Sequence, residues 1–187
     1  MSNLQILART IGVACALALA SAQAADEKTD SGPVRLIRNI QTGATNQVAT
    51  VAFGAGVRSC APRIDQVTNF LMQGATGASA LLFVPERDPD NNMVSMAMEW
   101  KTDTLSRAYV SATFSPNTGL GCAAEYETVQ YWNEACTAVA AKTFKGATAS
   151  GTIGSEISIL TIGPSARVFM MRATPSSCVT IKKEVLR

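Results

Sequence analysis

The sequence predicts an α+β fold, in which an antiparallel β-meander sheet carries two helices packed on one face and is stabilised by disulfides. Short runs rich in Val, Ile, Thr and aromatic residues alternate with turn sequences, which is typical of antiparallel strands. Two other segments carry apolar residues at helical spacing, and four cysteines lie beyond the N-terminal region. We expect residues 34–187 to form a single domain.

The N-terminus has the pattern of a secretory signal peptide over residues 1–24. Arg9 supplies a positive charge, residues 10–20 (TIGVACALALA) are apolar, and the AQA ending at Ala24 is the small-x-small pattern that signal peptidase cleaves. The apolar run is shorter than the about 20 residues of a permanent membrane anchor. We therefore expect cleavage near Ala24, a periplasmic or secreted location without stable membrane insertion, and a flexible tail over residues 25–33 (ADEKTDSGP).

The cysteines indicate two disulfides, because removal of the leader leaves an even number in an exported chain. Three pairings are possible, and the sequence does not select among them. We favour a local Cys122–Cys136 bond together with a Cys60–Cys178 bond that would join the two ends of the domain. A zinc site would show paired short spacings, and a thiol nucleophile would need a histidine, which this chain lacks.

The domain is predicted to begin with two short strands and a helix. Residues 34–40 and 47–53 have strand composition and are joined by the turn-rich QTGAT. Pro62 suits the first turn of a helix over 63–74, and Gly74 suits its end. The apolar residues at helical spacing are Ile64, Val67, Phe70 and Leu71.

Three strands follow, over residues 78–86, 93–100 and 107–114. The connections between them, RDPDNN and KTDTLS, are good turn sequences. Because these connections are short, we expect the strands to be antiparallel neighbours.

Residues 122–132 are ambiguous, because their apolar residues fit one helical stripe while their Tyr, Thr, Val and Trp content favours a strand. We predict a strand, followed by a helix that Asn133 caps and that ends at Gly146. A single helix over 123–144 is the alternative. The small residues of 145–155 predict a loop.

The last three strands are predicted over residues 156–162, 166–173 and 178–185. Gly163 and Pro164 form the turn between the first two of them. We expect these strands to close the sheet as an antiparallel set.

Residues 91–100 (NNMVSMAMEW) combine three methionines with a tryptophan. In a strand, alternate side chains share a face, and methionine is an adaptable core residue. We therefore interpret this face as core, with a Cu(I) site of thioethers and indole as the alternative. The core face would hold Val94, Met96, Met98 and Trp100, and a copper site would use the last three with Met170 or Met171.

Residues 88–99 resemble a calcium loop in spacing, since acidic and amide residues occupy positions one, three, five and twelve. Met93 stands where such a loop requires glycine, and a strand rather than a helix follows. We interpret the segment as a hairpin turn. The residues concerned are Asp88, Asp90, Asn92 and Glu99.

Catalytic groupings are sparse in this sequence. The absence of histidine excludes Ser-His-Asp and Cys-His mechanisms, which leaves a carboxylate pair or a serine–lysine pair. The carboxylates in apolar or ambiguous settings are Glu99, Glu125 and Glu127, of which the last two would share one strand face. We assign no catalytic, cofactor-binding or metal-binding residue.

The charge balance argues against nucleic acid or an anionic membrane as the main partner of the chain. It holds 16 Lys and Arg against 14 Asp and Glu, and loss of Arg9 with the leader leaves a net charge of +1 without a basic cluster. We expect a non-enzymatic binding or accessory module of the bacterial cell envelope that recognises another envelope or secreted protein, or an envelope polymer. The alternatives are a periplasmic copper or small-ligand carrier and a hydrolase that depends on carboxylates or lysine. The oligomeric state stays open.

Overall fold

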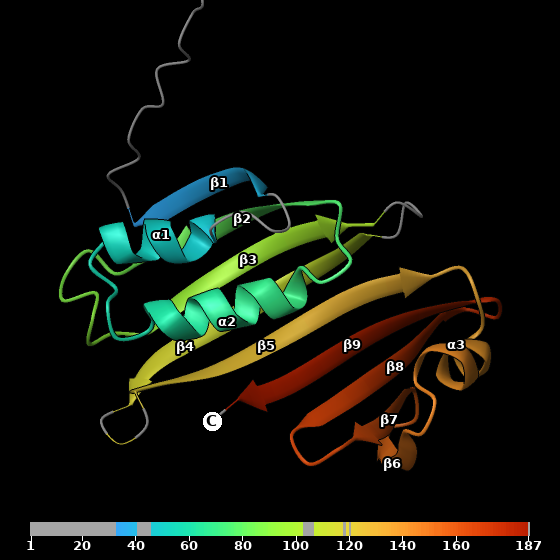
Figure 1. Ribbon diagram of the computed structural model, residues 1–187. Coiled ribbons are helices and arrows are strands. Elements are labelled where there is room, and N and C mark those ends of the chain that lie inside the picture. Colours follow the sequence, from blue (N-terminus) through green and yellow to red (C-terminus); the bar gives the residue numbers. More distant parts are fainter. Residues whose placement is uncertain (1–32, 41–45, 103–106, 118, 120, 187) are drawn as a thin grey trace, which may run out of the picture.

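The computed structural model describes residues 33–40, 46–102, 107–117, 119 and 121–186. The predicted signal peptide and all of the predicted tail except Pro33 lie outside these residues. Within the described residues, nine strands form one open antiparallel sheet accompanied by three helices (Figure 1). The strands are β1 (Val34–Ile40), β2 (Gly77–Phe83), β3 (Val94–Lys101), β4 (Arg107–Asn117), β5 (Gly121–Trp132), β6 (Thr148–Ile153), β7 (Ile157–Ile162), β8 (Ala166–Thr174) and β9 (Ser177–Leu186). The helices are α1 (Gln47–Gly54), α2 (Ala61–Leu71) and α3 (Cys136–Thr143).

The strand order is β1-β2-β3-β4-β5-β9-β8-β7-β6, so the sheet consists of two meanders rather than one. The first meander runs from β1 to β5. The chain then passes through α3 to the far edge and returns strand by strand, until β9 pairs with β5 from Trp132↔Cys178 to Ala124↔Leu186. The antiparallel arrangement is confirmed, but the single meander is wrong, because the last strand completes the middle of the sheet.

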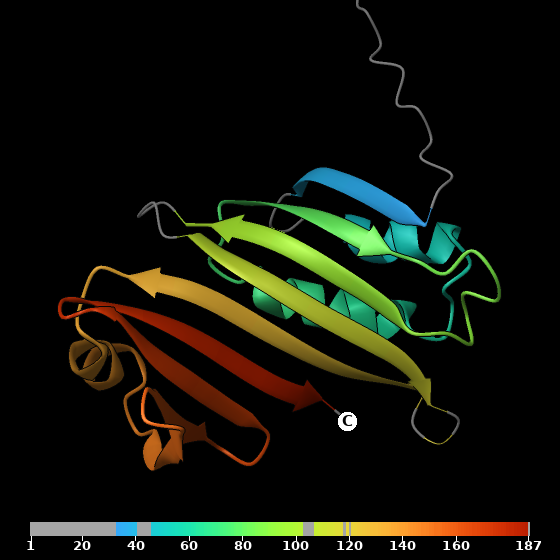
Figure 2. The ribbon, with the colours of Figure 1, turned by 180° about the vertical axis from the view of Figure 1, so that it is seen from behind.

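All three helices lie on one face of the sheet, and Figure 2 shows the sheet from behind with the helices beyond it. Helices α1 and α2 cover β1–β5 and enclose a first core that includes Ile64, Leu82 and Phe114. Helix α3 packs on β8 and β9 around a smaller second core, which contains Val139 and Val168. The expectation of helices on one face holds, although the structure has three of them and is mostly sheet.

The segment predicted as a strand over 47–53 is the helix α1, which corrects the composition-based prediction. Asn46 caps it, since its side-chain oxygen accepts hydrogen bonds from the backbone N–H groups of Val48 and Ala49 at 3.0 and 3.2 Å. Val48 and Ala52 lie four residues apart on one side of the helix and are fully buried. Burial of this side outweighs the strand preference of valine and threonine, which is a weak tendency.

Residues 145–155 are not the predicted loop, because they contain β6. This strand forms the edge of the sheet, and all six of its residues are exposed. An edge strand without a buried side shows no alternation of apolar and polar residues, so its sequence has the small polar composition of a loop.

The ambiguous segment is the strand β5, as predicted, and the alternative of one helix over 123–144 is wrong. Helix α3 begins at Cys136 with Ala135 as its N-terminal cap, rather than after Asn133. The predicted strands at 34–40, 93–100, 107–114, 156–162, 166–173 and 178–185 and the helix after Pro62 are confirmed within a few residues; the strand predicted over 78–86 ends at Phe83.

All four cysteines of the described residues form disulfides, but the favoured pairing is wrong. The bonds are Cys60–Cys122 and Cys136–Cys178. Cys122 lies near the start of β5, a strand of 12 residues, and Cys136 lies beyond its other end, at the start of α3. The strand extends over roughly 40 Å and therefore does not bring the two cysteines within bonding distance. Each bond instead joins the start of a helix to the sheet beneath it, and two disulfides are typical of an oxidising compartment.

Candidate functional site

The face of the sheet opposite the helices carries a continuous apolar surface on its C-terminal half. Two cross-strand rows of side chains run over β6, β7, β8, β9, β5 and β4. No described helix covers them, as the rear view shows (Figure 2). We name this surface the C-terminal apolar patch; it consists of Ile153, Ile157, Met171, Val179 and Tyr131 in the first row, and Ile159, Phe169, Ile181, Val129 and Tyr109 in the second.

None of these ten side chains is buried. Tyr109, Tyr131 and Ile153 are 52%, 59% and 52% exposed, and the other seven are partly exposed. Isolated apolar residues are common on protein surfaces, but ten in two adjacent rows form a contiguous patch. Such a patch is the usual mark of a surface that another molecule covers.

The strands β7 and β8 are apolar on both faces, which explains how this part of the patch arises. In β8, Val168 and Met170 point to the second core under α3, while Phe169 and Met171 point to the uncovered face. A strand with only one covered face ordinarily alternates apolar with polar residues. The lack of alternation in 156–162 and 166–173 is therefore the sequence signal of the patch, and only the placement of α3 shows which residues are uncovered.

Charged side chains border the patch on one side. Lys183 of β9 lies in the row next to the patch, and its ammonium group is 2.6 Å from Glu125 and 2.9 Å from Glu127 of β5. The hydrogen bond to Glu125, followed by the one to Glu127, raises the pKa of Lys183 above its ordinary value, so this lysine stays charged. Arg167 of β8 lies opposite Lys183 in the β8–β9 ladder. It also lines a surface hollow of about 700 Å³ with Pro164, Ser165, Val185 and Leu186.

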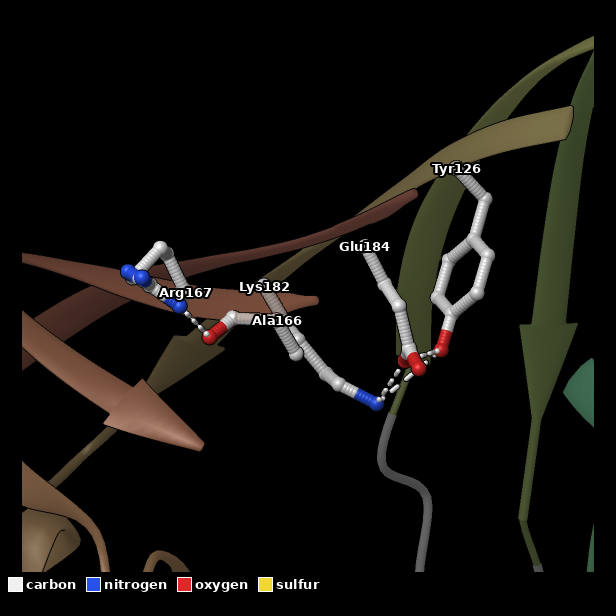
Figure 3. A network of polar contacts seen from close by, with 5 residues as sticks. All are labelled: Tyr126, Ala166, Arg167, Lys182 and Glu184. Carbon is white, nitrogen blue, oxygen red and sulfur yellow. Dashed lines mark hydrogen bonds and ion pairs between the residues drawn. The ribbon is translucent and has the colours of Figure 1, made fainter. Parts of the chain in front are cut away.

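A polar network lies on the helix-bearing face, between the two cores (Figure 3). Tyr126 of β5 donates a hydrogen bond to the carboxylate of Glu184 in β9. Lys182 lies 3.0 Å from both the Tyr126 hydroxyl and the Glu184 carboxylate, and its ammonium group is 5.7 Å from the centre of the Phe70 ring in α2. Figure 3 shows Arg167 apart from this network, donating to the carbonyl of Ala166 at 2.8 Å.

The network is built to hold elements together rather than to transfer a proton. Burial, and then the hydrogen bond to Glu184, raises the pKa of Tyr126 well above its ordinary value, so the phenol stays protonated and acts as a donor. Burial raises the pKa of Glu184, but hydrogen bonds from Tyr126 and Lys182 outweigh it and leave the pKa below its ordinary value. A neutral phenol, a carboxylate and an ammonium group therefore satisfy one another, and together they tie α2 and β5 to β9.

The methionine-rich face of β3 belongs to the core, as predicted. Met96 and Met98 are 1% exposed in the first core, and Trp100 packs against it partly buried. Met170 lies in the second core, whereas Met171 points to the uncovered face. The fold therefore does not bring together the thioethers considered for a copper site.

The segment whose spacing resembles a calcium loop forms the turn between β2 and β3 and the first part of β3. The Asp90 carboxylate accepts hydrogen bonds from the backbone N–H groups of Ser59 and Arg58 at 2.5 and 2.7 Å, just before α2 begins. The hydrogen bond from Ser59 is the main cause that lowers the pKa of Asp90. Asn92 donates to the backbone carbonyl of Asp88 at 2.9 Å, which closes the turn. Among the described residues, no group of three or more metal-ligating side chains occurs.

The three candidate carboxylates are all ion-paired. Glu125 and Glu127 share a face of β5, as predicted, and both bind Lys183. Glu99 binds Arg107 at 2.9 Å on the surface, beside a hollow of about 160 Å³ that Asn39 and Lys101 also line. This hollow is smaller than the several hundred Å³ typical of small-molecule sites.

No helix in the described part of the chain has both the length and the apolar character needed to cross a membrane. Comparisons with models of protein families, with curated proteins and with solved structures found no match.

Proposed function

We propose that the protein is an exported, non-enzymatic binding module that holds another envelope or secreted protein against its C-terminal apolar patch. The observation that carries this proposal is the contiguous set of ten uncovered apolar side chains on a sheet that helices cover on the other face. Protein interfaces commonly have an apolar centre, enriched in aromatic and methionine side chains, with a polar rim. The patch, with its border of Lys183, Glu125 and Glu127, has this composition.

A protein partner fits the patch better than an envelope polymer. Carbohydrate polymers present hydroxyl groups that need hydrogen-bond partners. Of the ten patch side chains, only the phenol groups of Tyr109 and Tyr131 offer hydrogen bonds to such a ligand. The remaining aliphatic, thioether and phenyl groups favour contact with apolar protein side chains.

The scaffold behind the patch supports a role as a rigid platform. The second core and the Cys136–Cys178 bond fix α3 against β8 and β9 from the other side. Rigid surfaces lose little conformational entropy on binding, so more of the contact energy appears as affinity. The disulfides and the predicted leader are consistent with a partner outside the cytosol.

Affinity capture with the oxidised protein tests this proposal. The bait is exposed to an envelope and secreted fraction of its own cells in three forms: wild type, Tyr131→Lys and Leu81→Lys. Tyr131 is 59% exposed in the patch, and Leu81 is 37% exposed on the same uncovered face but in β2. A charge in the patch must be desolvated on binding, so we expect a partner that wild type and Leu81→Lys retain and Tyr131→Lys loses.

Ile181→Lys, at the centre of the patch, provides a second variant, and near-UV circular dichroism verifies that each bait is folded. The proposal is wrong if no partner is captured, or if Tyr131→Lys and Ile181→Lys bind it as the wild type does. Equal loss with Leu81→Lys would move the interface away from the patch and would also contradict the proposal.

A further inference from the structure

The strand β6 is an edge of the sheet that lacks two of the usual kinds of protection, charge and proline. Its sequence, TASGTI, contains no charge and no proline, and all six residues are exposed. On its outer side, no described strand pairs with it. Edge strands present unpaired N–H and C=O groups to other strands, and proteins generally block them with charge, proline or bulges.

The opposite edge, β1, is protected. Pro33 precedes it, and Arg35 and Arg38 lie within its seven residues. Its pairing with β2 is irregular between Ile37 and Ile40, and Asn39 has a φ of +53°. Both edges have an irregular ladder, so they differ in charge and proline, and this difference makes β6 the edge that is better suited to pairing.

The charges beside β6 are complementary to those of a second copy of the same strand. If β6 pairs antiparallel with another β6 about a twofold axis, Thr148 lies opposite Ile153 of the second copy. Lys145 lies in the turn that precedes the strand and Glu156 in the turn that follows it, and the same register brings these two turns to the same end of the paired strands. Both are exposed, so two opposite-charge contacts would form, one at each end of the paired strands.

A bulge makes this register possible. Residues opposite each other in an antiparallel pair point to the same face, but residues five positions apart in a regular strand point to opposite faces. In β6, Ser150 has no partner in the ladder with β7, so Thr148 and Ile153 both lie on the uncovered face, beside Thr161 and Ile157. The two ends of the strand therefore place their side chains on the same face, and the charges that flank them have opposite signs, as a twofold pairing requires.

We propose that β6 pairs antiparallel with β6 of a second copy, so that one sheet continues through both molecules. The uncovered faces then lie on the same side, and the dimer presents two C-terminal apolar patches. The bulge at the twofold axis shortens the ladder, so the contact is small and we expect a weak, reversible dimer. This inference does not depend on the proposed function, because no partner takes part in it.

Sedimentation velocity of the oxidised protein tests the dimer from roughly 10 µM to 1 mM. We expect the mass to rise with concentration from that of a monomer to twice that value. Lys145→Glu and Glu156→Lys should each weaken the association by about tenfold, because each turns two attractive contacts into repulsive ones. The double variant Lys145→Glu/Glu156→Lys should restore it.

Lys101→Glu is the matched control, since it makes the same charge change on an exposed residue of β3, far from β6 in the strand order. It should dimerise as the wild type does. A monomer at every concentration overturns the proposal. A dimer that both single variants leave unchanged, or that the double variant does not restore, overturns the assignment to β6.

Discussion

Trp132 of β5 donates a hydrogen bond of 2.8 Å from its indole nitrogen to the hydroxyl of Thr180 in β9. Thr180 is 3% exposed, although it is polar, and it lies opposite Gln130 in the β5–β9 ladder. This ladder is the point where the two meanders meet. The contact therefore joins segments that are 48 residues apart in the sequence.

Loss of the Thr180 hydroxyl should destabilise this joint. Thr180→Val keeps the shape of the side chain but leaves the indole N–H of Trp132 without its partner, which costs about 1–2 kcal/mol when the group is buried. Urea denaturation should show this loss in the free energy of unfolding, and Thr180→Ser, which retains a hydroxyl, should recover most of it. Equal stability of Thr180→Val and wild type would contradict the prediction.

Removal of either disulfide should lower stability by a similar amount but loosen different regions. The bonds close loops of 62 and 42 residues, for which loop entropy predicts about 4 kcal/mol each. Hydrogen exchange should locate the effect in α2 and the start of β5 for Cys60→Ala/Cys122→Ala. It should locate the effect in α3 and β9 for Cys136→Ala/Cys178→Ala. Peptide mapping that recovers Cys122 linked to Cys136 would contradict the pairing.

Glu184 should make the free energy of unfolding decrease at acidic pH. Its pKa in the folded protein is below its ordinary value, so its contribution is present above its unfolded pKa and is lost as pH falls through its folded pKa. Glu184→Gln should cost roughly 1–2 kcal/mol near neutral pH, and this difference from wild type should shrink as pH falls from about 6 to about 3. Glu86→Gln, on an exposed residue, is the control and should leave stability unchanged. A pH-independent difference for Glu184→Gln would contradict the prediction.

Met96 and Met93 distinguish a core role from a surface role for the methionine-rich run. Met96 is 1% exposed and Met93 is 62% exposed. Met96→Ala should leave a cavity in the first core and lower the free energy of unfolding by about 2–5 kcal/mol, whereas Met93→Ala should change it by less than about 0.5 kcal/mol. Thermal or urea denaturation measures both. Equal effects of the two substitutions would place Met96 outside the core.

Local chemistry was enough to predict several elements. The face of β3 that holds Met96 and Met98 follows from strict alternation, and α2 follows from Pro62 with apolar residues at helical spacing. In both cases one side of the element is buried and the other is not, so the spacing of apolar residues along the sequence indicates which side is buried. The prediction of two disulfides likewise required only the predicted export and the even number of cysteines that remain after the predicted leader.

Other features were decided by contacts between residues that are distant in the sequence. The segment 47–53 is a helix because Val48 and Ala52 fit the core beside α2, which its own composition does not indicate. The cysteine pairing depends on the return of β9 to β5, because that return places Cys178 next to Trp132 and within reach of Cys136.

The amino-acid sequence by itself determined the strand-rich class, the main helix, the number of disulfides and the absence of histidine chemistry. Only the tertiary structure decided the strand order, the partners of the cysteines and which side of β7 and β8 is uncovered. The physical reason is that alternation reports burial along one strand, whereas a strand with two apolar faces gives no sign of where the single covering helix lies. Val168 and Phe169 are adjacent and both apolar, and only the position of α3 places Val168 in the core and Phe169 in the patch.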